Sequence, residues 1–195
     1  MSYTLGVEMV MRALLVLAAL LPQDSYLPLK DGALLTYVVE DVGTEATSPA
    51  REIIAEVGGS TKPSEAEWMP VTNYLGYRAC WLRETAEGIE FKLDEKAEAP
   101  ALTILKRSAK TGETWTGTLG KEALTFTLRG EETVERADTK VQALHVEFTA
   151  AVQKHAGHTP THGDVWFAAG LGIVRAQVTT DLDCHTATTK VYRLK

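Results

Sequence analysis

Alternation of apolar and polar residues with a period of two is the dominant pattern along the chain. The clearest runs are residues 89–94, 124–129, 144–153 and 174–179. In the third of these, Leu144, Val146 and Phe148 alternate with polar neighbours. Successive side chains of a β-strand point to opposite faces, so each run predicts a strand with one apolar and one polar face.

Burial of one face is typical of antiparallel sheets, because parallel strands are usually apolar throughout. Turn signals separate about nine or ten predicted strands. The signals are Asp31-Gly32, Gly58-Gly59, Glu87-Gly88, Gly120-Lys121 and Gly130. We therefore predict an all-β fold with a single antiparallel, strongly curved sheet that forms a half-barrel or a closed barrel. A two-sheet β-sandwich is the alternative.

The alternation also assigns the side chains that face inward. The predicted inward set is Leu144, Val146, Phe148, Leu124, Phe126, Val174 and Val178. A register slip of one residue would turn this set toward solvent, so the pattern specifies the register. A sheet with no helix to cover it must curl, or its concave face becomes a binding site. We predict Trp81 and Trp115 as the ligand contacts on that face.

The beginning of the chain has a different pattern. Ala13–Leu21 is a run of nine apolar residues that follows Met11-Arg12. A bilayer span needs about 20 apolar residues, whereas a positive start and a short apolar run are typical of a secretory signal peptide. We predict a signal peptide at 1–22, with 1–10 an over-extended start, and cleavage between Leu20 and Tyr26. The alternative is a buried N-terminal helix.

Residues 23–195 are then a single β domain, located in the periplasm or secreted. Three segments of this domain carry further information: YLPLKDGALLTY at 26–37, ETVERADTKVQALHV at 132–146 and DVWFAAGLGIV at 164–174. Together they resemble a widespread set of exported bacterial β-proteins of uncertain function. That set opens with Y-F-P-L-x-x-G-x-x-W-x-Y, continues with E-x-V-x-V-P-A-G-x-F and closes with W-F-A-x-G-x-G-x-V.

The closing motif is the most specific part of this resemblance. Its matching residues are Trp166, Phe167, Ala168, Gly170, Gly172 and Val174. The chain departs from the pattern at Leu35, where the set has tryptophan, and at Ala137-Asp138-Thr139, where it has P-A-G. The resemblance implies export and an antiparallel sheet, and it supplies no catalytic residues.

Composition and charge narrow the functional classes. The 195 residues include 26 acidic and 20 basic side chains, for a net charge of −6. A nucleic-acid partner is not expected, because such proteins carry a basic surface. The chain contains no G-x-S-x-G, H-E-x-x-H or Walker motif. We therefore expect a binding protein rather than an enzyme, with no catalytic residues and no cofactor.

One group of residues could hold a metal. His155, His158, His162 and Asp164 lie in the segment KHAGHTPTHGD, and imidazoles with a carboxylate suit zinc or copper. The segment joins two predicted strands and contains glycine and proline, so gathering its ligands would cost chain entropy. We predict a polar loop without metal.

Two functions remain. The first is an exported non-enzymatic β-domain that binds an apolar small molecule or an envelope partner on its concave face, without a membrane span. The alternative is a metal-dependent hydrolase that uses the His155–Asp164 loop. Cys80 and Cys184 could form a disulfide in an exported protein or remain buried thiols, and the sequence leaves both open.

Overall fold

The computed structural model describes residues 25–27, 30–43, 48–58, 68–93, 100–151, 161–183 and 186–195. The predicted signal peptide lies outside these residues, so its cleavage stays a prediction. The described part consists of twelve strands and contains no helix. The strands are β1 (Leu34–Gly43), β2 (Ser48–Val57), β3 (Met69–Tyr74), β4 (Tyr77–Glu84), β5 (Gly88–Lys92), β6 (Leu102–Lys106), β7 (Thr114–Leu119), β8 (Glu122–Arg136), β9 (Thr139–Ala150), β10 (His162–Ala168), β11 (Gly172–Asp183) and β12 (Thr186–Leu194).

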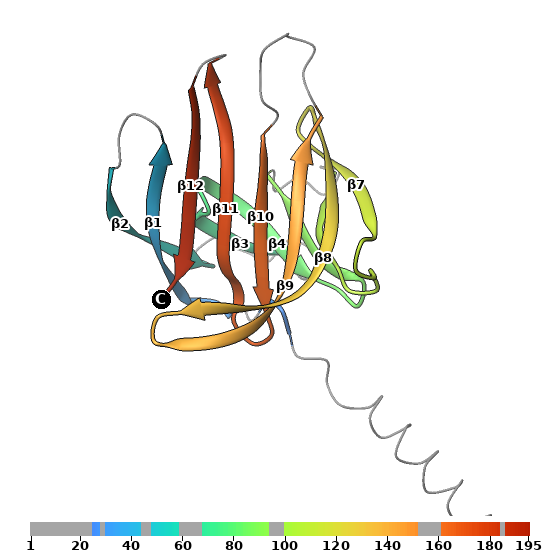
Figure 1. The fold of residues 1–195 in the computed structure, drawn as a ribbon. Coiled ribbons are helices and arrows are strands. Elements are labelled where there is room, and N and C mark those ends of the chain that lie inside the picture. Colours follow the sequence, from blue (N-terminus) through green and yellow to red (C-terminus); the bar gives the residue numbers. More distant parts are fainter. Residues whose placement is uncertain are drawn as a thin grey trace, which may run out of the picture.

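All twelve strands belong to one antiparallel sheet, in the order β6-β5-β4-β3-β2-β1-β12-β11-β10-β9-β8-β7. The sheet curls until its two ends approach one another, and the result is a nearly closed barrel (Figure 1). The prediction of a single, strongly curved sheet is therefore confirmed. The pairing of β1 with β12 joins the first and the last of the described strands, so that all twelve form one sheet. The alternative β-sandwich would have two separate sheets.

The end strands β6 and β7 meet without backbone pairing, and side chains connect them. The indole Nε1 of Trp115 donates a hydrogen bond to the Thr103 carbonyl oxygen at 2.8 Å. Lys106 Nζ lies 2.7 Å from Glu113 Oε1. At Gly117 the Leu102 side chain occupies the space that a Cβ would need. This seam closes the barrel through side chains instead of a hydrogen-bond ladder.

Five of the seven residues of the predicted inward set line the interior of the barrel. Val146, Phe148, Leu124, Phe126 and Val178 line the interior cavity, and Leu144 and Val174 pack in the surrounding core. Gly163 of β10 pairs with Phe148 and leaves room for its ring, since a Cβ at this position would meet that ring and the Gln177 carbonyl oxygen.

Gly130 has a different role from the one predicted. It does not separate two strands, because it lies within β8 at a bulge in the β8–β9 register, with φ +120°. An extra residue in one strand bends it and increases its twist. Beyond this bend the β8–β9 hairpin turns across the lower end of the neighbouring strands (Figure 1), where Arg136 donates to the Lys195 carbonyl oxygen.

A short segment before β1 crosses the lower end of the barrel. We call this segment, Ser25–Leu27, the floor segment. The Ser25 hydroxyl and the Tyr26 N–H both donate to the Glu84 carboxylate, which also pairs with Arg107. At the other side the Gly170 N–H donates to the Ser25 carbonyl oxygen. The floor segment therefore connects the end of β4 with the β10–β11 turn.

Candidate functional site: the barrel interior

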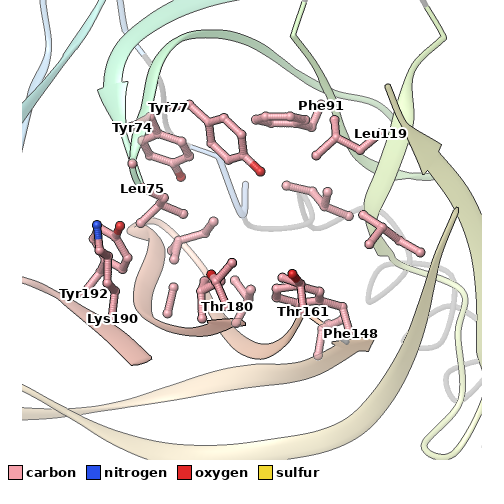
Figure 2. A pocket seen from close by; sticks show the side chains of 18 of the residues that line it. Tyr74, Leu75, Tyr77, Phe91, Leu119, Phe148, Thr161, Thr180, Lys190 and Tyr192 are labelled. Atoms are coloured by element: carbon pink, nitrogen blue, oxygen red, sulfur yellow. The ribbon is translucent and has the colours of Figure 1, made fainter. Parts of the chain in front are cut away.

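The barrel contains a cavity of about 670 Å³ that is partly open to solvent, and residues from every strand except β2 line it. The walls are mainly aliphatic and aromatic, as the close view shows (Figure 2). The aromatic lining residues are Phe91, Phe126, Phe148, Phe167, Tyr74, Tyr77 and Tyr192. A concave, apolar space with a few polar groups has the general character of a small-molecule site.

The polar groups of the cavity are not distributed evenly. Along β12 the inward residues run from Thr188 and Lys190 to Tyr192 and then to Leu194, which is buried in the core. The inward-facing row of β12 is therefore polar at its Thr188 end and apolar at its Leu194 end.

The neighbouring strands repeat this gradient. Asp41 is paired with Lys190, and Val39 with Tyr192, so β1 becomes less polar in the same direction. On β11, Thr180 is paired with Thr188 and Ala176 with Tyr192. Glu122 of β8 begins a row that continues through the apolar Leu124 and Phe126. The cavity thus has one polar end, which we call the rim, and apolar walls below it.

Three charged residues line the cavity at the rim: Asp41, Lys190 and Glu122. Among the described residues Lys190 forms no ion pair. Asp41 Oδ2 lies 3.9 Å from Arg51, at the outer limit of an ion pair, and its Oδ1 is buried without a hydrogen-bond partner in the described part. Lys190 and Asp41 therefore keep unused bonding capacity next to the cavity.

Tyr74 and Tyr192 belong to one wall of the cavity, and Tyr37 packs against Tyr74. The Tyr37 and Tyr74 rings meet edge to face with centroids 6.0 Å apart, and the Tyr37 hydroxyl donates to the Ile173 carbonyl oxygen at 3.0 Å. Burial raises the pKa of both hydroxyls. Burial and then the Asp41 carboxylate raise the pKa of Tyr192, so all three remain neutral hydrogen-bonding groups near neutral pH.

This wall depends on a tight hairpin turn at Leu75-Gly76. Both residues take positive φ, +48° and +90°, as a two-residue type I′ turn requires. A Cβ on Gly76 would lie 2.9 Å from the Tyr192 hydroxyl oxygen. Glycine at this position therefore lets the β3–β4 turn approach β12 across the interior.

The two tryptophans predicted as ligand contacts do not line this cavity. Trp81 lies between the fully buried Cys80 and Leu82, and alternation places it on the outer face. Trp115 stacks on the Phe126 ring, with centroids 5.6 Å apart and planes 10° apart, and so supports a lining residue from behind. Whether either indole contacts a ligand stays a prediction. The aromatic residues that line the cavity are instead the phenylalanines and tyrosines of the inward-facing rows.

The candidate metal residues do not form a site in the described part. His155 and His158 lie outside the described residues. His162 and Asp164 stand two positions apart on β10, and within the described ranges no group of three His, Cys, Asp or Glu side chains could hold a metal.

Asp164 belongs instead to a cluster that sequence reasoning missed. It bonds one ring nitrogen of His145 at 2.7 Å, and Glu132 bonds the other at 2.7 Å. The Trp166 ring stacks on His145 and its Nε1 donates to Glu132 at 2.9 Å. This hydrogen bond, then the histidine, lower the pKa of Glu132. The cluster holds the β8–β9 hairpin against β10 on the outer face.

The buried thiol of Cys80 is free within the described residues, and burial raises its pKa to about 12. A thiol with so high a pKa is protonated at neutral pH and is a weak nucleophile. Cys184 lies outside the described residues.

Comparisons with known proteins add little to this geometry. No family model matches the chain, and no curated protein sequence matches it. One solved structure is similar in shape: a "putative exported protein with YmcC-like fold" from Bacteroides fragilis, with 12% identity and a TM-score of 0.48. The match covers 89% of this chain and 100% of that chain. Similarity this low supports no conclusion about function, and the motif resemblance stays an expectation. The described residues include no helix of sufficient length and hydropathy to cross a bilayer.

Proposed function

We propose that this chain is an exported, non-enzymatic β-domain that binds an apolar small molecule inside its barrel. The observation that carries the proposal is the interior cavity of about 670 Å³ with mainly apolar walls. Small-molecule sites commonly measure about 300–1,000 Å³. A fully packed barrel would leave no such space.

The apolar walls provide the driving force. Each methylene group transferred from water into such an interior contributes about 0.8 kcal/mol. Export is supported by the short apolar run at 13–21 behind Arg12, which has the character of a signal peptide. A small molecule fits better than an envelope protein, because strands surround the cavity on nearly every side.

A dye titration tests the proposal. The uncharged dye Nile red should bind the full chain saturably, with one site and increased emission. Val178→Trp adds bulk to the cavity wall and should weaken binding at least about tenfold, or about 1.4 kcal/mol. Ile54→Trp places the same side chain at an outer position that is 52% exposed, and it should leave binding unchanged.

Urea denaturation of both variants shows whether each remains folded. Absence of saturable binding to the folded wild-type chain would overturn the proposal. Equal binding by wild type and a folded Val178→Trp variant would show that the dye sits elsewhere, and it would overturn the proposal as well.

A further inference from the structure

The rim of the cavity defines a second feature of the ligand, and this inference rests on the proposed function. Four inward positions on three adjacent strands form a polar patch: Asp41, Lys190, Thr188 and Thr180. Next along the same strands lie the buried Val39, Tyr192 and Ala176, of which Tyr192 and Ala176 line the cavity. Figure 2 shows Lys190 and Thr180 on the same wall of the cavity. A ligand that fills this space meets apolar groups along most of its length and polar groups at one end.

From this arrangement we propose that the cavity takes a single-chain anionic amphiphile, with its hydrocarbon chain between the apolar walls and its anionic group at the Lys190 ammonium. Lys190 is the reason that we expect a negative charge on the polar group of the ligand. It lines the cavity, and it has no ion-pair partner among the described residues. An anion at this position would supply the missing partner.

The other charges near the rim determine how strong the preference is. Arg51 stands beside Asp41 and adds a second positive charge at this wall. Asp41 is the adjacent negative charge, and it should weaken the binding of an anion. Glu122 lies four strands away in the sheet order, on β8. The local balance around Lys190 is therefore positive, whereas the wall near Glu122 is negative.

Three probes with the same chain separate charge from hydrophobicity: dodecanoate, dodecanol and dodecylamine. Each probe is titrated against the full chain loaded with Nile red at about pH 8, and displacement of the dye is measured. Each probe is kept below its own critical micelle concentration. Wild-type protein should bind dodecanoate about tenfold more tightly than dodecanol, as expected for a hydrogen bond to a charged group. Dodecylamine should bind more weakly than dodecanoate. Each added methylene in a series of carboxylates should tighten binding about fourfold.

Variants assign the preference to particular residues. Lys190→Gln should remove the preference for dodecanoate over dodecanol and leave dodecanol binding unchanged. Asp41→Asn removes the neighbouring negative charge and should increase the affinity for dodecanoate about threefold. A variant that is merely destabilised would not show such a gain. Lys140→Gln removes an exposed lysine of β9 away from the cavity and serves as the matched control.

The possible failures are distinguishable. If no probe displaces the dye from folded protein, the proposed function and this inference both fail. If dodecanol binds as tightly as dodecanoate to wild type, the apolar site stands and the anionic inference is wrong. Retention of the dodecanoate preference in a folded Lys190→Gln variant would likewise overturn the assignment.

Discussion

Removal of the Glu84 carboxylate should release the floor segment. This one side chain accepts hydrogen bonds from the Ser25 hydroxyl and, at 2.7 Å, from the Tyr26 N–H, and it pairs with Arg107. The Arg107 guanidinium also lies 5.6 Å from the centre of the Tyr26 ring. Glu84→Ala therefore removes the group that joins the floor segment to the end of β4.

The expected loss follows from the environment of the pair. Only 12% of the Arg107 side chain and 18% of the Glu84 side chain are exposed. Removal of one partner from a fully buried pair costs about 3–5 kcal/mol, and the two lost hydrogen bonds add about 0.5–1.5 kcal/mol each. Partial exposure and the remaining contacts of Arg107 reduce this sum. We expect a decrease in the free energy of unfolding of about 3 kcal/mol.

Equilibrium urea denaturation measures this loss. With an m-value of about 2 kcal/mol/M, the midpoint should fall by about 1.5 M. Glu147→Ala is the matched control, because Glu147 pairs with Arg129 at an exposed site, where the side chains are 37% and 49% accessible. An exposed pair contributes about 1 kcal/mol or less.

A double-mutant cycle identifies the mechanism. Ser25→Ala should destabilise the wild-type chain more than it destabilises the Glu84→Ala background, because the Ser25 hydroxyl donates to Glu84. The hydrogen bond that the same hydroxyl accepts from the Leu27 N–H at 3.1 Å is lost in both backgrounds and cancels in the cycle. Equal losses in Glu84→Ala and Glu147→Ala, or strictly additive effects of Ser25→Ala and Glu84→Ala, would refute this reasoning.

Three further predictions concern the sheet itself. Tyr37→Phe leaves the buried Ile173 carbonyl oxygen without its donor and should lower the free energy of unfolding by about 1–2 kcal/mol in urea; an unchanged midpoint would contradict it. Gly163→Ala inserts a Cβ against a neighbouring strand and should cost about 2–3 kcal/mol, whereas Gly170→Ala, with φ +74° and open space around it, should cost about 1 kcal/mol. Equal costs would argue against the steric explanation. The pKa of Glu132 in the folded state lies below its ordinary value. The stability that the ionised Glu132 carboxylate gives to the fold is therefore fully present above the ordinary pKa, and it is lost as the pH falls through the lowered pKa. Glu132→Gln should therefore reduce the drop in melting temperature between pH 7 and about pH 3, and an identical drop in both proteins would exclude this role.

The closing motif illustrates how far a local pattern can predict structure. Trp166 and Phe167 are adjacent, and alternation alone predicts that they face opposite sides of the sheet. In the structure Trp166 stacks on His145 at the outer face and Phe167 lines the cavity. Gly170 and Gly172, which also belong to the closing motif, both take positive φ where β10 turns into β11.

Other features depend on residues that are distant in the chain. The cluster of Glu132, His145 and Asp164 requires β8, β9 and β10 to lie in one register with a bulge at Gly130. The alternation in each strand excludes a slip by one residue, but a slip by two residues keeps the same side chains inward. The exact register is therefore selected by many side-chain contacts between each pair of strands. The outward position of Trp81 follows from the full burial of its neighbours Cys80 and Leu82, which the aromatic character of Trp81 does not reveal.

By itself, the sequence determined the strand character, the inward rows and the antiparallel class, because these follow from a period of two that each strand carries locally. The tertiary structure alone decided that the sheet nearly closes through the β6–β7 seam, that a cavity of about 670 Å³ remains, and that Asp41 and Lys190 meet at its rim. These features depend on the curvature and twist of the whole sheet and on the pairing of the first strand with the last. Such long-range geometry is the sum of many small contacts, and no short segment of the chain contains it.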